Sequence, residues 1–326
     1  MMRLGIAGLG GMGQNHLRNY LRMPDRVRVT ALADPVRLRD GALGPADAKL
    51  GQGEQSTALP DARWYDDYRE LCESEDVDVV CIAMPSDHHA DAAVAALDAG
   101  KHVFTEKPMA LSDADCRRML DAAGRGDRVL MVGHVLRFWA PYVTAWEVID
   151  SGRYGRVVGA SMRRFVGMPG SGWFADPARS GGPALDLHIH DVDTALWFWG
   201  APDRMDAGGG RRGRAHVLHS RWSYDDGPSV QFECYWDAGT PFRCELRVVM
   251  EQATLLFDTA GEAALLRMDA EGVERLTAEA VSDALLAEDE YFLACAADNA
   301  EPVRCRPSES MAAVRLALET ARRAEQ

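Results

Sequence analysis

The sequence predicts an α/β protein of two domains, the first built on a doubly wound parallel sheet. Its 326 residues exceed what one hydrophobic core usually holds, and 47% of them are apolar, which is enough for two cores. In the first half, short apolar runs alternate with helical patterns, the order of elements that builds a parallel sheet.

The elements of the first half follow in that order. A buried strand at 3–8 leads through glycines into a helix that ends before Pro24. Further strands are expected at 26–34, 76–84, 101–106 and 128–133. The clearest helices between them cover 87–100 and 112–124, and Ser112 is a candidate N-cap for the second.

The first strand-to-helix junction carries the pattern G-x-G-x-x-G at Gly8, Gly10 and Gly13. The first glycine allows a tight turn, the second lets a pyrophosphate approach the backbone, and the third lets helix and strand pack closely. Free N–H groups at the helix start, including those of Gly11 and Met12, can bind phosphate. This pattern predicts a bound dinucleotide; the alternative is a glycine turn in a fold without nucleotide.

The second strand ends at Asp34, 21 residues after Gly13, where a carboxylate can accept the ribose hydroxyls. Such a carboxylate repels a 2′-phosphate, so NAD is favoured over NADP. Arg37 and Arg39 follow closely and leave NADP possible.

Ligands of doubly wound sheets bind beyond the carboxyl ends of the strands. The residues expected to line the cofactor there are Met84, Pro85, Ser86, Glu106, Lys107 and His134. Lys107 follows a central strand and precedes a proline that fixes its backbone, so it can be aimed at the cofactor. The alternative for Lys107 is a solvated surface lysine.

Several segments together resemble the glucose-fructose oxidoreductase / inositol dehydrogenase / MocA (Gfo/Idh/MocA) family. They are "GLGGMG", "ADP" after the second strand, "MPSDHHADAAVAALDAGKHVFTEKP", "GHVLRFWAP" and "GGPALDLHIHDVD", which occur in the family's order between residue 2 and the 190s. The resemblance implies a Rossmann domain at 1–135 and a substrate-binding and oligomerisation α/β domain at 136–326. The second domain would have an open, mainly antiparallel sheet, with the C-terminal helices packed on it and able to touch the first domain.

The resemblance also implies roles for single residues. Lys107 matches the family's catalytic lysine, His190 its catalytic histidine, and Asp186 the acid one helical turn earlier. His89 matches a histidine near the cofactor, whereas Ser86 replaces the usual asparagine. The implied reaction is hydride transfer between a nicotinamide cofactor and a carbinol or carbonyl carbon of a sugar, polyol or sugar acid.

The chemistry of the stretch 180–193 depends on its secondary structure. After Pro183 the apolar spacing is helical, which puts Asp186 and His190 within about 60° of each other and His188 on the far side. A strand would instead align Asp186, His188 and His190, as a metal would require. The helix favours an Asp186/His190 pair and no metal; a metal site on His188, His190 and Asp191 is the alternative.

Other polar residues are candidates for the substrate site. Arg137 is expected to line the pocket or join the domains, or else to form a structural ion pair. Arg163 suits an acidic substrate or a solvated strand edge, and Trp173 could stack on a sugar or pack structurally. His188, where the family usually has glycine, could line the pocket, touch the other domain or pack in the core. Arg164 and Asp176 lie near the same segment.

The sequence of the second domain predicts mostly strands. A helix is expected from Pro141 to Gly152, followed by a strand at 156–168. The next expected elements are a hairpin at 216–236 and strands within 242–258 and 262–269. The chain then has helices at 282–300 and 307–326, with a short proline-containing strand between them. An open sheet face is a liability unless it is paired, so a homodimer or homotetramer is expected.

Bulk properties limit the class of protein. The net charge of −14 argues against nucleic-acid binding. Seven scattered cysteines predict reduced thiols, and no signal or membrane-spanning segment is evident, so a cytoplasmic location is expected. The function hypothesis is an NAD(P)-dependent oxidoreductase; the alternative is a non-catalytic NAD(P)-binding regulatory protein on the same fold.

Overall fold

The computed structural model describes residues 1–38, 43–44, 58–168, 172–213, 215–237, 239–277 and 284–325. The chain divides into two compact units, each made of two segments. The first unit contains Met1–Val135 and Val281–Met311, and the second contains Leu136–Ala280 and Ala312–Gln326.

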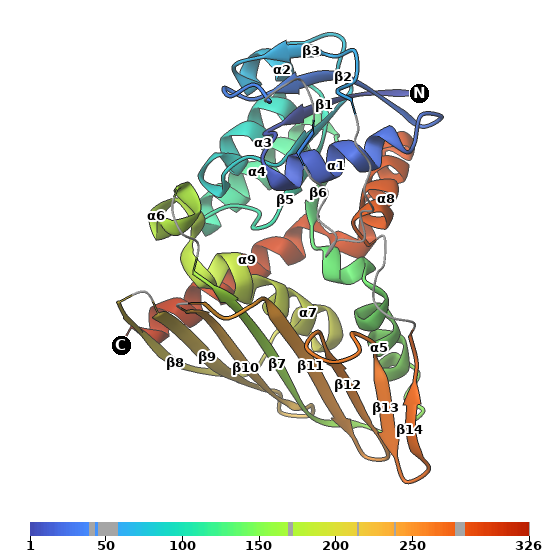
Figure 1. The fold of residues 1–326 in the computed structure, drawn as a ribbon, viewed down its shortest axis with the longest axis vertical. Helices are drawn as coiled ribbons and strands as arrows, with labels where there is room; N and C mark the ends of the chain where they lie inside the picture. The colour runs from blue at the N-terminus through green and yellow to red at the C-terminus, as the bar shows by residue number, and fades with distance from the viewer. Residues whose placement is uncertain are drawn as a thin grey trace. The chain divides into compact units, whose positions relative to one another are not determined.

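The first unit is built on a six-stranded parallel sheet of order β3-β2-β1-β4-β5-β6 (Figure 1). Its strands are β1 Met2–Ala7, β2 Val27–Ala33, β3 Arg63–Tyr65, β4 Val79–Ile82, β5 His102–Glu106 and β6 Leu130–Gly133. The strand order reverses between β1 and β4, which is the doubly wound arrangement whose ligands bind at the switch point. The sequence-based prediction of a Rossmann-type sheet is confirmed.

Helices connect these strands because each apolar stripe must be buried against the sheet. They are α1 Gly11–Leu21, α2 Tyr68–Glu73, η3 Ser86–His88, α3 His89–Asp98 and α4 Asp113–Gly126. Ser112 is the N-cap of α4, as predicted, and its hydroxyl accepts a 3.0 Å hydrogen bond from the Asp115 N–H. Two late elements also belong to this unit, α8 Ala284–Asp298 and η7 Val303–Cys305.

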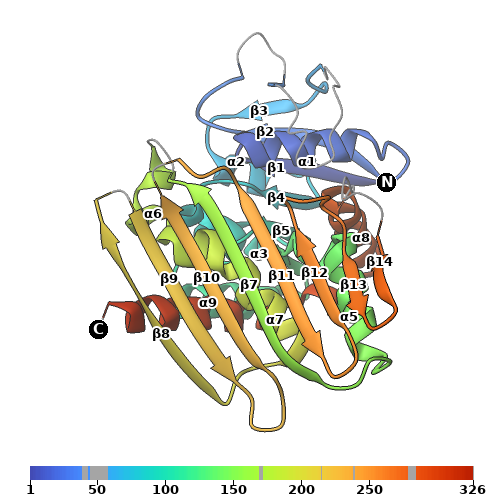
Figure 2. The ribbon, with the colours of Figure 1, turned by 60° about the horizontal axis from the view of Figure 1, so that its bottom comes forward.

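The second unit is built on an eight-stranded sheet of order β14-β13-β12-β11-β7-β10-β9-β8, whose strands lie side by side in Figure 2. The strands are β7 Val157–Gly167, β8 Arg204–Arg212, β9 Ala215–Ser223, β10 Ser229–Asp237, β11 Arg243–Met250, β12 Thr254–Asp258, β13 Leu266–Asp269 and β14 Gly272–Arg275. Every neighbouring pair is antiparallel except β7 and β10. The predicted open, mainly antiparallel sheet is confirmed.

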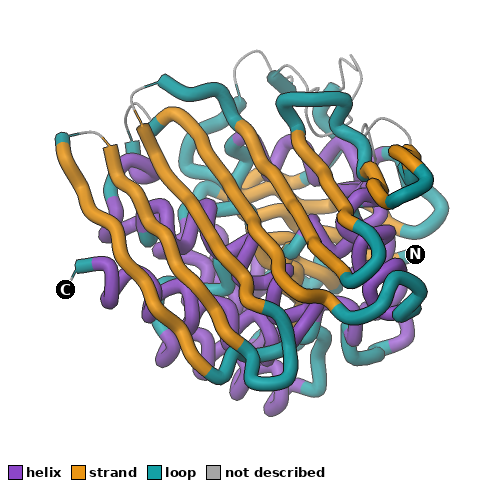
Figure 3. Tube along the Cα trace, turned by 90° about the horizontal axis from the view of Figure 1, so that it is seen from below, coloured by secondary structure: helices purple, strands orange, loops and turns teal. Residues whose placement is uncertain are grey.

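The helical elements of the second unit are η4 Val135–Phe138, which begins at the division, α5 Ala140–Asp150, η5 Trp173–Ala175, α6 Pro177–Ser180, η6 Ala184–His188 and α7 Ile189–Trp199. Of these, η6 contacts β7 and β10, α7 contacts β7, and Tyr142 of α5 packs edge-on against Phe257 of β12. The last helix, α9 Pro307–Ala324, crosses the division between the units. The sheet's inner face buries Trp222 and Trp236. Its outer face is seen with no helix of the described residues in front of it in Figure 3.

Some elements differ from the sequence-based expectation. Strands β3, β8 and β14 were not expected, and the turn η7 replaces the expected short strand before α9. We expected the C-terminal helices to pack on a second domain at 136–326 and to be able to touch the first; the structure groups α8 with the first unit, where it packs on α1. No described helix is long and apolar enough to cross a membrane. All seven cysteines are free and buried.

Candidate active site

The glycine turn after β1 has the shape that a dinucleotide requires. Gly8 has φ of +92°, and a Cβ there would lie 2.6 Å from the Ala83 carbonyl oxygen. A Cβ on Gly13 would lie 1.9 Å from the Gly8 carbonyl oxygen, so the helix can approach the strand only with glycine there. Conversely, a Cβ on Gly10 or Gly11 would meet no described atom within 4 Å. The turn is therefore tightly packed where helix meets strand and open at the helix N-terminus, beside Met12, where a phosphate could be held by free N–H groups.

Asp34 lies beside this turn at the end of β2. Its Oδ2 accepts a 2.8 Å hydrogen bond from the Leu9 N–H, and its Oδ1 accepts one of 2.8 Å from the Val36 N–H. These bonds fix the carboxylate next to the glycine turn, the position that a ribose-binding acid requires. Arg37 stacks on Trp64, with its guanidinium carbon 5.5 Å from the ring centroid. Arg39 lies outside the described residues.

The segment after β4 places its predicted residues at the same edge of the sheet. Met84 and Pro85 are half-buried, and Ser86, which begins η3, is buried. His89 is also buried: its Nδ1 lies 2.8 Å from the Pro108 carbonyl oxygen and its Nε2 lies 2.9 Å from that of Met84. The ring of His89 thus joins the segments that follow β4 and β5.

Lys107 follows β5 directly and is half-buried. Its backbone N–H donates a 3.0 Å hydrogen bond to Glu106 Oε2, and the Lys107–Pro108 peptide bond is cis. Burial raises the pKa of Glu106, but the hydrogen bond and charge of His16 and the charge of Lys107 outweigh it, so the pKa is lower than usual. His134 is buried just after β6.

Sequence reasoning missed His16 and Asp289. His16 Nε2 lies 3.0 Å from Glu106 Oε1, and its Nδ1 lies 2.8 Å from Asp289 Oδ1 on α8. Asp289 is separated from His16 by 273 residues, so no local pattern could connect them. The available signals were a histidine three residues after Gly13 and a run of three acidic residues inside the apolar helix α8.

In the second unit, the segment after Pro183 is helical, as expected, but begins as one π-helical turn. The turn covers Ala184–His188 and is continued by α7. Its wider spacing, about 4.4 residues per turn, still leaves Asp186 and His190 within about 30° of each other. Asp186 is buried and its Oδ2 accepts a 3.3 Å hydrogen bond from Trp236 Nε1, whereas His190 is half-buried.

His188 occupies the packing role among the three that we considered. It is 1% exposed, its ring lies edge-on to Phe232 at 5.3 Å, and its nitrogens have no hydrogen-bond partner among the described residues. Burial, together with the charge of Arg164, lowers the pKa of His188 to about 4. The ring is therefore neutral at pH 7 and part of the core.

The arginines have partners that the sequence could not identify. We expected Arg137 to line the pocket or join the domains, or else to form a structural ion pair. Its Nε and Nη2 donate to the two carboxylate oxygens of Asp193 at 2.9 and 2.8 Å, and both side chains are buried. This is the structural ion pair that we considered as the alternative.

Arg163 has its partner on the outer face of the sheet. Side chains alternate along β7, so Arg163 lies on the outer face of the sheet with Glu233, at 2.6 Å, while Arg164 faces α7 and pairs with Asp191 at 2.9 Å. Arg163 therefore does not share a face of the sheet with Asp186 and His190.

Trp173 and Asp176 lie in the segment that follows the undescribed residues 169–171. Trp173 is half-buried and contacts Phe174 edge-on at 5.0 Å. The carboxylate of Asp176 caps α6 by accepting from the Ala178 N–H. Among the described residues, no group of three or more His, Cys, Asp or Glu side chains could hold a metal ion.

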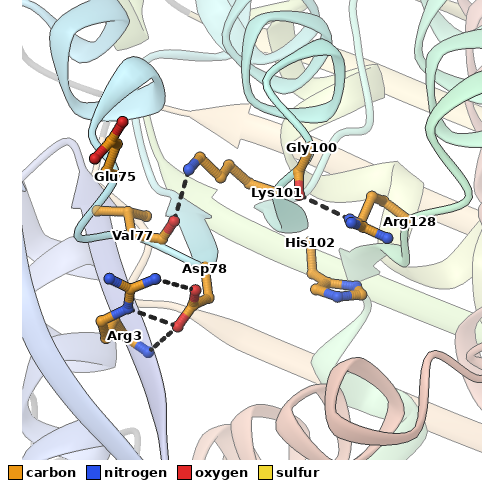
Figure 4. A pocket seen from close by; sticks show the side chains of 8 residues that line it. All are labelled: Arg3, Glu75, Val77, Asp78, Gly100, Lys101, His102 and Arg128. Carbon is orange, nitrogen blue, oxygen red and sulfur yellow. Dashed lines mark hydrogen bonds and ion pairs between the residues drawn. The ribbon is translucent and has the colours of Figure 1, made fainter.

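The opposite edge of the first sheet has a small polar pocket of about 180 Å³ at the amino ends of the strands. In Figure 4 its basic side chains bind neighbours: Arg3 binds Asp78, Lys101 binds the Val77 carbonyl, and Arg128 binds that of Gly100. Lys101 also binds the Ser74 carbonyl. Because these groups brace the ends of strands and helices, we do not count the pocket as part of the site.

Comparison with known proteins assigns both halves of the chain to one family. Residues 2–134 match the family model of an oxidoreductase family with an NAD-binding Rossmann fold, and residues 142–256 match the GFO/IDH/MocA C-terminal domain. Inositol 2-dehydrogenase of Salmonella typhimurium is 38% identical over 198 residues, which are 60% of this chain and 54% of that protein. The alignment thus spans about half the length of the curated relative.

Solved structures share the fold across the whole chain. Apo scyllo-inositol dehydrogenase from Lactobacillus casei has a TM-score of 0.77 at 23% identity, over 100% of this chain and 96% of that one. Levoglucosan dehydrogenase in complex with NADH and L-sorbose has a TM-score of 0.81 at 17% identity, over 100% and 97%. The two matched domain models together cover most of the sequence, and the chain belongs to the Gfo/Idh/MocA oxidoreductase family.

Proposed function

We propose that the protein is an NAD(P)-dependent dehydrogenase that oxidises a carbinol carbon of an inositol-like polyol or a related sugar, and reduces the corresponding carbonyl in reverse. The observation that carries the proposal is the position of Lys107, fixed by Glu106 at the carboxyl end of β5 in a unit whose glycine turn fits a dinucleotide. The substrate class comes from the names of the inositol dehydrogenases to which the chain is similar.

The described residues suit a nicotinamide cofactor. The N–H groups of Gly11, Met12 and Gly13 would hold its pyrophosphate and Asp34 its adenosine ribose. When bound, the cofactor supplies the acceptor for the hydride that leaves the substrate carbon. Asp34 supports NAD as the preferred cofactor, because its charge repels a 2′-phosphate.

The chain's own residues must manage the hydroxyl proton. His190 takes that proton as the alcohol is oxidised and returns it in the reverse reaction. Lys107 donates to the same oxygen and stabilises the negative charge that develops on it. Asp186, on the same helical face as His190, orients the histidine or binds a neighbouring hydroxyl.

We further propose that the protein is a homodimer or homotetramer assembled through the outer face of the eight-stranded sheet. Open sheet faces and edges in native proteins are commonly protected by pairing or by charge. Here the outer face carries the Arg163–Glu233 pair and partly exposed Val249.

The test is a panel of inositols, other polyols, aldoses and uronates, offered with NAD or NADP while absorbance is followed at 340 nm. We expect turnover with at least one polyol, and a loss of at least about a hundredfold in kcat for Lys107→Met and for His190→Ala. Lys101→Met is the matched control, since Lys101 lies at the amino end of β5 and binds backbone carbonyls.

The contrary outcomes separate two errors. Equal rates in wild type and Lys107→Met would refute the assigned roles. Tight NADH binding without turnover on any member of the panel would favour a non-catalytic NAD(P)-binding regulatory protein on the same fold.

A further inference from the structure

A chain of buried hydrogen bonds in the first unit ends at the backbone of Lys107. Asn19 Nδ2 donates to Asp289 Oδ2 at 2.8 Å, and Asp289 Oδ1 lies 2.8 Å from His16 Nδ1. On the other side of the ring, His16 Nε2 lies 3.0 Å from Glu106 Oε1. Glu106 Oε2 in turn accepts the Lys107 N–H at 3.0 Å. Three elements, α8, α1 and β5, thus contribute to holding one peptide group.

The protonation state of His16 follows from its two partners. Both ring nitrogens face carboxylate oxygens, which can only accept, so the ring satisfies both contacts only as the imidazolium. The His16 side chain is fully buried, where an unpaired charge would be costly. Burial lowers the pKa of His16, but the charge of Asp289 and the hydrogen bonds that the ring donates to Asp289 and Glu106 raise it well above its usual 6.5.

Neighbours on every side keep this ring in place. Tyr20 of α1 stacks on it at 6.4 Å, and Phe104 of β5 meets it edge-on at 5.0 Å. Cys81 of β4 is buried beside it, and α8 also buries Glu288 next to Asp289. The ring therefore has little freedom to abandon either carboxylate.

We propose that His16 and Asp289 are positioning residues that fix the backbone of Lys107 through Glu106. The inference rests on the proposed catalytic role of Lys107 and adds two residues that never reach the substrate. It also gives α8, contributed by the far end of the chain, a function in the first unit. His16 holds one carboxylate oxygen of Glu106, so the other oxygen stays aimed at the Lys107 N–H.

The first test measures hydrogen exchange at the Lys107 amide, which needs neither substrate nor cofactor. In His16→Gln a neutral amide replaces the imidazolium and can donate to only one carboxylate at a time. We expect the Lys107 amide to exchange about tenfold faster in His16→Gln than in wild type. In the milder Asp289→Asn its exchange rate should lie between those two. His102→Gln, a change at the amino end of β5, should leave it unaltered. Unchanged protection in both His16→Gln and Asp289→Asn would overturn the proposal.

The second test uses the pH profile of kcat to separate positioning from general loss of structure. With His16 present, the pKa of Glu106 is lowered and the carboxylate stays ionised into acid. Without the imidazolium, burial dominates and the pKa of Glu106 rises, so the acid limb of kcat should move upward by about one pH unit or more. A kcat reduced equally at all pH values, with an unmoved acid limb, would contradict the role.

Two safeguards keep these outcomes interpretable. Asp289→Asn keeps a hydrogen-bonding side chain, so it tests the same chain of contacts if His16→Gln does not fold. If wild type turns over no polyol while the Lys107 amide still loses protection in His16→Gln, then the proposed function fails and the positioning by His16 stands.

Discussion

Gly13 and Gly10 differ in what surrounds them, although both belong to one sequence motif. The sequence predicted the tight turn at the three glycines, the place of Asp34 at the end of β2 and the shared helical face of Asp186 and His190, because each depends on local geometry. It could not choose a partner for Arg137 or the face of Arg163, because those depend on residues 56 and 70 positions away. Sequence patterns therefore did not predict which residues far apart in the chain pair with each other.

The two glycines lead to a matched prediction. Gly13→Ala places a Cβ 1.9 Å from a backbone oxygen, so we expect a melting temperature lower by several degrees and loss of NADH binding. Gly10→Ala meets no described atom within 4 Å, so stability should stay the same while NADH binds at least about tenfold more weakly. Thermal melting and fluorescence titration measure both; tight NADH binding by Gly10→Ala would argue against the assigned phosphate site.

His188 predicts a pH-dependent stability. Its folded pKa of about 4 lies below the ordinary 6.5, so below pH 6.5 the unfolded state binds the extra proton and folding weakens. Between pH 7 and pH 5 this group alone should cost about 2 kcal/mol of unfolding free energy. Urea melts of wild type and His188→Leu at both pH values measure it; an equal acid-induced loss in His188→Leu would show that the histidine is not responsible.

The π-helical turn at Ala184–His188 shows what the sequence can say about an element. Apolar spacing distinguished helix from strand, and the segment is helical. Over five residues, however, spacing cannot separate an α turn from a π turn, because the two differ by less than one residue per turn. Short strands such as β3 and β14 were not predicted for a similar reason, since three or four residues carry almost no periodicity.

Helix α7 is held in the second unit by the Arg137–Asp193 and Arg164–Asp191 pairs. Asp193→Asn leaves the charge of Arg137 buried without its carboxylate, so we expect a loss of roughly 3–5 kcal/mol in unfolding free energy. Asp206→Asn, which breaks the exposed pair with Arg221, should cost less than about 1 kcal/mol. Denaturant unfolding of both variants gives the comparison; equal losses would mean that the buried pair is not specially important.

At the scale of the molecule, the chain order does not match the division into units. The sequence placed a domain limit in the 130s, yet α8 returns to the first unit, where Asp289 meets His16. Amphipathic patterning predicted that α8 covers a core, but a pattern cannot say which core. The buried carboxylate of Asp289 on α8 pairs with His16, which lies near the other end of the sequence, so no local pattern indicates that α8 packs in the first unit.

The oligomer is a prediction at this scale. Sedimentation velocity should give two or four times the chain mass of 35.7 kDa. Val249→Lys puts a charge on the outer face of the sheet and should shift the protein toward monomer, whereas Val273→Lys on the edge strand β14 should not. A monomeric wild type would contradict assembly through this face.

Transfer of deuterium tests the central claim most directly. A polyol that wild type oxidises is labelled with deuterium at its reacting carbinol carbon and incubated with NAD, and the reduced cofactor is examined by mass spectrometry. We predict that NADH carries the deuterium, that the rate falls with the label, and that Lys107→Met and His190→Ala form labelled NADH at least about a hundredfold more slowly. NADH without deuterium, or labelled NADH formed equally fast by Lys107→Met, would contradict the proposed reaction or its assigned residues.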